Sequence, residues 1–241
     1  MSTHCHTAIS MIQYSKYQEV TMYKAAIFDL DGTLLNSARD LEEACNYALS
    51  KYSLPNVDSQ SFTLRLGSGR RKLIESIVND FFDHGKKEII EEFQNYFNEY
   101  YDAHLSDYTR PYEGVNEGLE TLTKNNIITA VLSNKPHDFT IKLVNHFFGD
   151  NIKYISGLKD GYEPKPDPKA LLGIISDLRV KKDECIYIGD SEVDIRVSKN
   201  AGIKSLGGLW GFRDEALLKK EGADFLASSV NEMVDIIIKQ K

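Results

Sequence analysis

Residues 27–34 read Ile27-Phe28-Asp29-Leu30-Asp31-Gly32-Thr33-Leu34 and carry the strongest structural signal in the chain. The apolar run at 25–28 ends abruptly at turn residues, which predicts a buried parallel strand. Asp29 and Asp31 at its carboxyl end would repel each other and lose solvation unless a cation neutralised them. Ligands of α/β proteins bind in the crevice beyond such strand ends. The stretch therefore predicts a metal site in an α/β fold, and the alternative is an ordinary pair of loop acids.

A second strand-like run, residues 127–132, ends in Ser133, Asn134 and Lys135. A serine in this position is also a common turn former or helix cap, and the following Pro136 suits the first turn of a helix. The residues alone leave open whether the Ser133 hydroxyl donates a hydrogen bond to a phosphoryl oxygen or only shapes the turn.

Prolines flank Lys165 in the segment at 163–168 and hold the lysine in a stiff, non-helical stretch. Asp167 as N-cap and Pro168 as first helical residue predict a helix that continues through residues 169–172. A lysine beside a phosphate and several carboxylates offsets their charge as a compact cation. The alternative is a proline-rich loop with a solvated lysine.

A third apolar strand, residues 185–188, runs into Gly189 and Asp190, and Asp194 follows four residues later. If a helix begins near Ser191, both carboxylates face the same crevice. Acids at a helix start also complement the helix dipole, but a strand followed by Gly-Asp and a second acid is unusual for that role alone.

These four segments, taken in order, resemble the four motifs of the haloacid dehalogenase-like hydrolase superfamily, in its phosphatase branch. The resemblance covers roughly Tyr23 to the C-terminus and is greatest to the phosphoglycolate phosphatase group. It implies that Asp29 attacks phosphorus and forms an aspartyl-phosphate. Asp31 would protonate the leaving oxygen and then take a proton from water. Ser133 and Lys165 would stabilise the transferring phosphoryl group.

The same resemblance implies a Mg²⁺ ion held by Asp29, Asp190 and the backbone carbonyl of Asp31. Asp194 would support the metal shell or orient Lys165. The residues that the resemblance places against the substrate in the core are Gly32, Thr33 and Asn134.

Six short strand-like runs separated by helical patterns predict a parallel, doubly wound sheet in an α/β core. They lie at 25–28, 127–132, 152–155, 186–188, 203–206 and 225–226. In the superfamily's strand order the first run lies beside the run at 186–188. Asp29 and Asp190 would then meet at the topological switch point.

Residues 37–108 have almost no strand character and resemble the helical cap that related phosphatases insert after their first motif. Ser37 and Asp40 form a helix-start signal, and apolar residues at helical spacing over 89–100 predict packing within a helical bundle. The predicted core domain is then 23–36 plus 109–241.

The cap contains a glycine-rich basic loop at 65–72, in which Gly69 precedes Arg70. Glycines let the backbone approach a ligand, and a helix that starts after them presents N–H groups and positive charge to an anion. The loop resembles the substrate-specificity loop of the phosphoglycolate phosphatase group, so Gly69 and Arg70 are predicted substrate contacts. A solvated basic helix start is the alternative.

Composition narrows the function class. The chain has 241 residues and a formal net charge of -7, without a basic block, which argues against nucleic acid as a partner. Three scattered cysteines form no disulfide or zinc pattern, so a cytoplasmic protein is expected. No apolar run is long enough to span a membrane. We expect a monomer or weak homodimer.

The first 22 residues are polar and lack a secretory apolar segment. They are expected to form a flexible extension, and Met22 is an alternative start. His4, Cys5 and His6 supply only a partial metal-ligand set.

The expected function is Mg²⁺-dependent hydrolysis of a small phosphate monoester, with phosphoglycolate as a candidate. A sugar-phosphate mutase or an inorganic pyrophosphatase would use the same fold, and a dehalogenase would not need the acid at Asp31. A catalytically silent binding or regulatory protein is the alternative from a different class, and four intact motifs argue against it.

Overall fold

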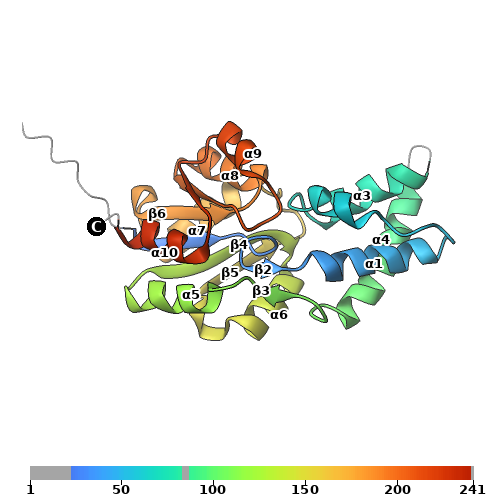
Figure 1. Ribbon diagram of the computed structural model, residues 1–241, viewed down its shortest axis with the longest axis horizontal. Coiled ribbons are helices and arrows are strands. Elements are labelled where there is room, and N and C mark those ends of the chain that lie inside the picture. Colours follow the sequence, from blue (N-terminus) through green and yellow to red (C-terminus); the bar gives the residue numbers. More distant parts are fainter. Residues whose placement is uncertain (1–22, 83–86, 240–241) are drawn as a thin grey trace, which may run out of the picture.

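A six-stranded parallel sheet, in the order β5-β4-β1-β6-β7-β8, forms the core of the protein (Figure 1). The computed structural model describes residues 23–82 and 87–239. From β1 the chain first adds β4 and β5 on one side and then β6 to β8 on the other, which confirms the predicted doubly wound α/β fold. The strands are β1 (Ala25–Phe28), β4 (Ile128–Pro136), β5 (Tyr154–Leu158), β6 (Cys185–Gly189), β7 (Lys204–Gly208) and β8 (Phe225–Ala227).

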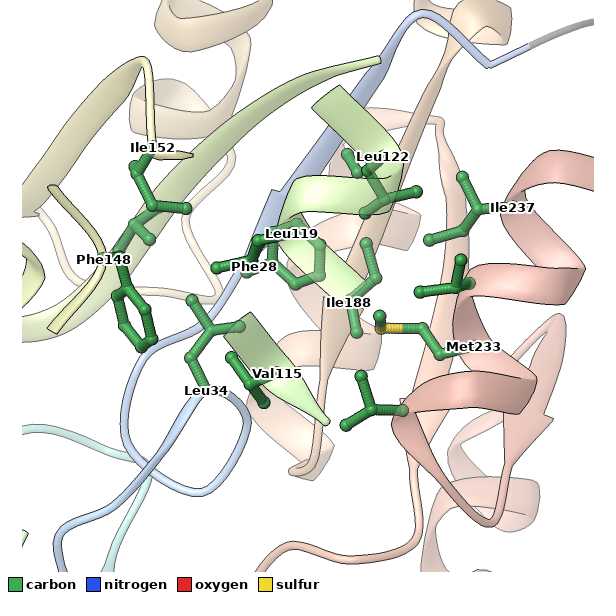
Figure 2. Close-up of a cluster of buried hydrophobic side chains, with 14 of the residues drawn as sticks. Phe28, Leu34, Val115, Leu119, Leu122, Phe148, Ile152, Ile188, Met233 and Ile237 are labelled. Carbon is green, nitrogen blue, oxygen red and sulfur yellow. The ribbon is translucent and has the colours of Figure 1, made fainter. Parts of the chain in front are cut away.

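Strand β1 is buried on both faces, as its apolar sequence predicts. Ile27 packs with α7 and α8 on one face of the sheet, and Phe28 packs with α5 and α10 on the other (Figure 2). Burial on both sides fixes the strand, and with it the position of the acids that follow. The helices of this domain are α5 (Val115–Lys124), α6 (His137–Phe147), α7 (Lys169–Leu178), α8 (Glu192–Ala201), α9 (Glu215–Glu221) and α10 (Val230–Lys239).

Strands β4 and β5 differ most from their predicted bounds, and β6, β7 and β8 differ by one or two residues at an end. Strand β4 continues past Leu132 to Pro136, with an irregular register against β5 between those residues. Strand β5 begins at Tyr154, two residues later than predicted, because Ile152 is buried in the core from the turn that precedes the strand. In both cases the apolar pattern identified buried residues correctly. The ends of each strand are set by its hydrogen bonds to the neighbouring strand, which the pattern does not show.

Helices α1 to α4 extend from one end of the sheet domain and pack around their own hydrophobic cluster (Figure 1). We call this helical unit the cap and propose, as predicted, that it spans residues 37–108. Its helices are α1 (Ala38–Ser50), α2 (Ser59–Phe62), α3 (Arg70–Phe81) and α4 (Lys87–Ala103). Phe93 and Phe97, from the predicted apolar stripe, are buried members of this cluster.

The chain crosses between the core and the cap twice, and the two crossings lie side by side. Strand β2 (Leu35–Asn36) pairs antiparallel with β3 (Arg110–Pro111). The predicted helix start is confirmed, with Asp40 in the first turn of α1. The buried Asp40 carboxylate accepts hydrogen bonds from the backbone N–H groups of Tyr108 (3.0 Å) and Thr109 (2.7 Å) and from the Thr109 hydroxyl (2.6 Å). Ser37 does occupy the N-cap position of α1, without a capping hydrogen bond. Neither side chain caps the helix, because Ser37 donates its hydroxyl to Asp31 and Asp40 binds the segment at Tyr108 and Thr109.

The predicted extension at 1–22 lies outside the described residues. Among the helices that the structure describes, none is both long and apolar enough to cross a membrane.

Candidate active site

The backbone of β1 delivers Asp29 to the switch point of the sheet. The Asp29 N–H donates to the carbonyl of Ile188 at 2.9 Å, so the residue continues the ladder between β1 and β6. Its carboxylate is 3 % exposed, and its Oδ1 lies 2.9 Å from the ammonium of Lys165. This oxygen accepts no hydrogen bond of normal geometry from the described residues. Burial raises the pKa of the Asp29 carboxyl, and Lys165 opposes that rise.

Asp190 follows β6 and lies beside Asp29, as expected from the superfamily's strand order. Its Oδ1 accepts a hydrogen bond from the Thr33 hydroxyl at 2.8 Å, and its Oδ2 accepts one from the Phe212 N–H at 2.8 Å. The Thr33 hydroxyl therefore orients Asp190, and its predicted contact with substrate stays a prediction. Gly32 has φ of +90°, and a Cβ there would lie 2.3 Å from Asp190 Oδ2. Only glycine permits this approach, so Gly32 makes room for Asp190.

Asp194 joins Lys165 to the start of α8. Its Oδ1 lies 2.7 Å from the Lys165 ammonium, while its Oδ2 accepts from the N–H (3.1 Å) and hydroxyl (2.6 Å) of Ser191. Lys165 also donates to the Tyr187 hydroxyl at 2.9 Å. Burial alone would lower the pKa of Lys165, but Asp194 and Asp29 hold it well above its usual range. The lysine is thus a fixed cation beside Asp29.

The helix after Lys165 begins one residue later than predicted. Pro168 is the N-cap of α7, and the side chain of Asp167 accepts from the Lys169 N–H at 2.9 Å.

The acids fit a small hard cation. One carboxylate oxygen from each of Asp29, Asp190 and Asp194 lies within 4.8 Å of the others, and all three residues are buried. Burial together with Asp194 and Asp29 raises the pKa of Asp190. Buried carboxylates that share one site need a compensating charge, and oxygen ligands favour Mg²⁺. Both oxygens of Asp190 and both of Asp194 also accept hydrogen bonds or pair with Lys165, so these contacts do not choose between the three acids as metal ligands.

Ser133 and Asn134 lie on the irregular end of β4, opposite Asp29. Ser133 lines the cavity between core and cap, and its Oγ accepts from the Lys135 N–H at 3.3 Å. Asn134 accepts from the Lys165 N–H at 2.7 Å and donates to the carbonyls of Lys165 and Gly67, each at 3.2 Å. Its side chain thus ties the lysine segment to the cap loop, in addition to its position on the cavity wall.

Asp31 faces the cavity with its carboxylate held from two sides. The Ser37 hydroxyl donates to Oδ1 at 2.5 Å, and the ammonium of Lys135 donates to both oxygens at 3.1 and 3.0 Å. Sequence reasoning gave Lys135 no role. The sequence shows only that Lys135 follows Ser133 and Asn134 at the end of the predicted strand. Its partner Asp31 lies 104 positions away along the chain.

The cap loop closes the other side of the same cavity. Gly69 is the N-cap of α3, and Arg70 is the first helical residue, as the glycine-rich loop predicts. Both residues line the cavity with Asp29, Asp31 and Ser133. The guanidinium of Arg70 donates to Asn98 on α4 at 2.7 Å. The structure therefore brings the predicted cap residues to the predicted core residues.

Arg213, which sequence reasoning also missed, joins the core to the cap loop. It is 8 % exposed, and its guanidinium donates to the carbonyls of Thr63 (3.0 Å), Leu64 (3.0 Å) and Leu66 (2.9 Å). Its Nε also donates to Glu192 on α8 at 2.9 Å. Nothing local in the sequence around Arg213 indicates partners so distant.

Comparison with known proteins identifies the family. A sequence profile described as haloacid dehalogenase-like hydrolase matches residues 26–207. The chain belongs to this family. The match includes all four predicted motifs and most of the sheet, so it confirms the predicted superfamily.

Individual relatives agree with this assignment. A phosphoglycolate phosphatase of Neisseria meningitidis is 30% identical over 90% of this chain and 95% of its own length. An N-acetylmuramic acid 6-phosphate phosphatase of Pseudomonas aeruginosa is 27% identical over 89% of this chain and 94% of its own length. The crystal structure of a predicted phosphoglycolate phosphatase from Haemophilus somnus has a TM-score of 0.82, with 26% identity over 89% of this chain and 97% of that one. The comparisons confirm the predicted resemblance to the phosphoglycolate phosphatase group and the predicted phosphatase class.

Proposed function

We propose that this protein is a phosphoric monoester hydrolase that acts on small phosphate esters, with phosphoglycolate as the leading candidate substrate. One observation carries the proposal: a buried aspartate paired with a lysine ammonium faces the same cavity as an acid, a serine hydroxyl and a cap arginine. The names of the relatives support the same chemistry.

Asp29 is the proposed nucleophile, because it is the carboxylate at the switch point and lies within contact distance of a fixed cation. The Lys165 ammonium and the Ser133 hydroxyl would stabilise the charge of the transferring phosphoryl group. Asp31 is the proposed acid and base: it would protonate the leaving oxygen and then take a proton from the attacking water. Positioned proton transfer of this kind contributes about 10²–10⁴-fold to the rate.

Mg²⁺ is the proposed cofactor, held by Asp29, Asp190 and the backbone carbonyl of Asp31. It would supply charge neutralisation between the nucleophile and the phosphoryl oxygens. Asp194 supports this arrangement by holding Lys165 in place, which is one of the two roles that the sequence suggested for it.

The test is release of inorganic phosphate from a panel of esters in the presence of Mg²⁺. The panel includes phosphoglycolate, a hexose 6-phosphate and N-acetylmuramic acid 6-phosphate, and the anhydride pyrophosphate is assayed beside them. A hydrolase releases phosphate from at least one ester, and a mutase instead converts a sugar phosphate to its isomer. A protein that does neither is a binding or regulatory protein, and the proposal then fails. The predicted cytoplasmic location and oligomeric state stay predictions.

A further inference from the structure

Tyr187 contacts Lys165 and is not used by the proposed chemistry. It lies on β6, two residues before Gly189, and it is fully buried. Its register partner on β1 is Ile27, and both side chains belong to the apolar cluster on the face of the sheet that α7 and α8 cover. A tyrosine hydroxyl in such a cluster needs polar partners. Here those partners belong to the site.

The first partner of the Tyr187 hydroxyl is the cation beside the nucleophile. The Lys165 ammonium donates to this hydroxyl at 2.9 Å. The same ammonium lies 2.9 Å from Asp29 Oδ1 and 2.7 Å from Asp194 Oδ1. An ammonium has three N–H groups, so these three oxygens match its full donor capacity. Two of the three partners are carboxylates of the acid cluster, and Tyr187 is the neutral third.

The second partner lies on another strand. The Tyr187 hydroxyl donates to the carbonyl of Leu132 at 3.0 Å, whereas Asp194 Oδ1 lies farther away, at 3.3 Å. Strand β1 lies between β6 and β4 in the sheet, so the contact joins two strands that do not pair with each other. Leu132 is bonded directly to Ser133, and the register of β4 against β5 becomes irregular after Leu132. The hydroxyl therefore holds β4 at the residue just before the serine.

The two groups that Tyr187 holds are those proposed to stabilise the transferring phosphoryl group. Lys165 comes from the loop before α7 rather than from a strand, and its ammonium is carried on a flexible four-carbon stem. Ser133 lies where β4 leaves its regular register. Stabilisation of developing charge needs donors that are already in place, and a misplacement of 1 Å can cost about 10²-fold in rate. Both groups therefore need a fixed support.

We propose that Tyr187 is a positioning residue for phosphoryl transfer: its single hydroxyl fixes the Lys165 ammonium and the backbone at Ser133 relative to each other. The inference rests on the proposed function and adds to it a residue that does not touch the substrate. A hydroxyl that only satisfied the interior of the sheet would change stability when removed and would leave the reaction alone.

Tyr187→Phe removes the hydroxyl and keeps the ring. With the ester that the wild-type protein hydrolyses best, kcat is expected to fall by at least about 10-fold, because both donors lose their support. The change in KM should be less than about 3-fold, since the loss is felt where charge develops. Tyr187→Met has a flexible side chain that adapts to the same space, and it carries the same expectation if the phenylalanine variant does not fold.

Inhibition by two anions gives a readout that a change in stability alone does not move. Orthovanadate takes the five-coordinate geometry of the transferring phosphoryl group, whereas inorganic phosphate resembles the product. In Tyr187→Phe the inhibition constant of orthovanadate should rise about 10-fold, and that of phosphate should rise by less than about 3-fold.

Ile186→Val is the matched control. Ile186 precedes Tyr187 on β6, is fully buried and belongs to the cluster with Phe28 on the other face of the sheet. Loss of one buried methyl group lowers the unfolding temperature, as loss of a bonded hydroxyl does. It removes no partner of Lys165 or Leu132, so kcat and the orthovanadate constant should stay at their wild-type values.

A Ser133→Ala background tests the link between the two contacts. If Tyr187 acts through both groups, Tyr187→Phe should lower kcat less in this background than in the wild-type protein, because the serine that it helps to place is already absent. An equal loss in both backgrounds would limit the role to Lys165 and would overturn the link to Ser133.

The inference and the proposed function fail on different results. If the wild-type protein hydrolyses no ester in the panel, the proposed function fails and takes the inference with it. If the wild-type protein is active and folded Tyr187→Phe has the kinetics of Ile186→Val, only the inference fails, and Tyr187 is a core residue. Equal rises in KM and in the orthovanadate constant would also overturn it, because the hydroxyl would then support substrate binding rather than transfer.

Discussion

The guanidinium of Arg213 donates a hydrogen bond to the backbone carbonyl of Leu66 at 2.9 Å, across the boundary between the core and the cap. The neighbouring Phe212 N–H donates to Asp190 at 2.8 Å. The same short segment therefore touches a proposed metal ligand and the segment that leads into the specificity loop. Cap position and the acid cluster are connected by a few bonds.

Arg213→Met tests this connection. It leaves three carbonyls without their donor, among them the buried one of Leu66, so we expect a loss of about 1–3 kcal/mol of unfolding free energy. We also expect faster hydrogen exchange in residues 63–70 and a higher KM, because the cap loop is released. Arg196→Met is the control: Arg196 forms a comparable pair with Glu221 at 2.6 Å but lies on an exposed surface. If Arg196→Met speeds hydrogen exchange in residues 63–70 as much as Arg213→Met does, the contact between Arg213 and the cap loop does not hold the cap in place.

Asp29→Asn tests the nucleophile. The amide keeps the shape of the side chain but cannot attack phosphorus, so kcat should fall by at least about 10³-fold. The metal-free variant should unfold at a higher temperature than the metal-free wild type, because burial raises the pKa of Asp29 despite Lys165, so the fold disfavours the ionised carboxylate that the amide replaces. Phosphate release and thermal unfolding are measured on the same preparation. Substantial activity in a folded variant would remove Asp29 from its role.

Metal dependence tests the acid cluster. EDTA should abolish activity, Mg²⁺ should restore it, and Ca²⁺ should restore it poorly because it prefers more ligands at longer distance. Binding should also stabilise the fold, by about 2.7 kcal/mol when Mg²⁺ is at 100 times its Kd. Asp190→Asn should lose most of that stabilisation, as measured by thermal unfolding with and without Mg²⁺. Full activity in a metal-stripped protein would contradict the assignment.

The stability of the metal-free protein should depend on pH in a direction that the buried acids set. Burial raises the pKa of Asp29 and of Asp190, so the folded state binds more protons than the unfolded chain above the ordinary carboxyl pKa of about 4. Stability should therefore fall as the pH rises above about 4, until both folded-state pKa values are passed. Mg²⁺ favours the ionised acids, so its stabilising effect should grow over the same interval. A rise in metal-free stability across that interval would show that these acids are not the dominant groups.

The sequence was sufficient where structure depends on neighbours along the chain. An apolar run that ends in polar residues is a buried strand with polar groups at its carboxyl end. This pattern predicted that Asp29, Ser133 and Asp190 lie at the same edge of the sheet. Gly32 was also recognisable, although the reason for it, the approach of Asp190, depends on the fold.

The sequence was insufficient where a side chain is used by a distant partner. Asp40 has the spacing of a helix-start signal, but its carboxylate binds backbone groups 68 and 69 positions away. Lys135 and Tyr101 meet only because the cap folds back over the end of β4. Arg213 sits in a loop without periodic pattern, and its partners are known only once the cap loop is placed. Such roles depend on packing between units rather than on local pattern.

Because β2 pairs with β3 and Asp40 binds Thr109, the chain leaves the core for the cap and returns from it at adjacent positions. An inserted unit tethered at one point can change length and sequence without disturbing the order of the sheet strands. The acids of the sheet lie outside the inserted unit, which contributes Tyr101 and Arg70 to the wall of the cavity. A change confined to the cap can therefore alter one wall of the cavity while the sheet and its acids keep their positions.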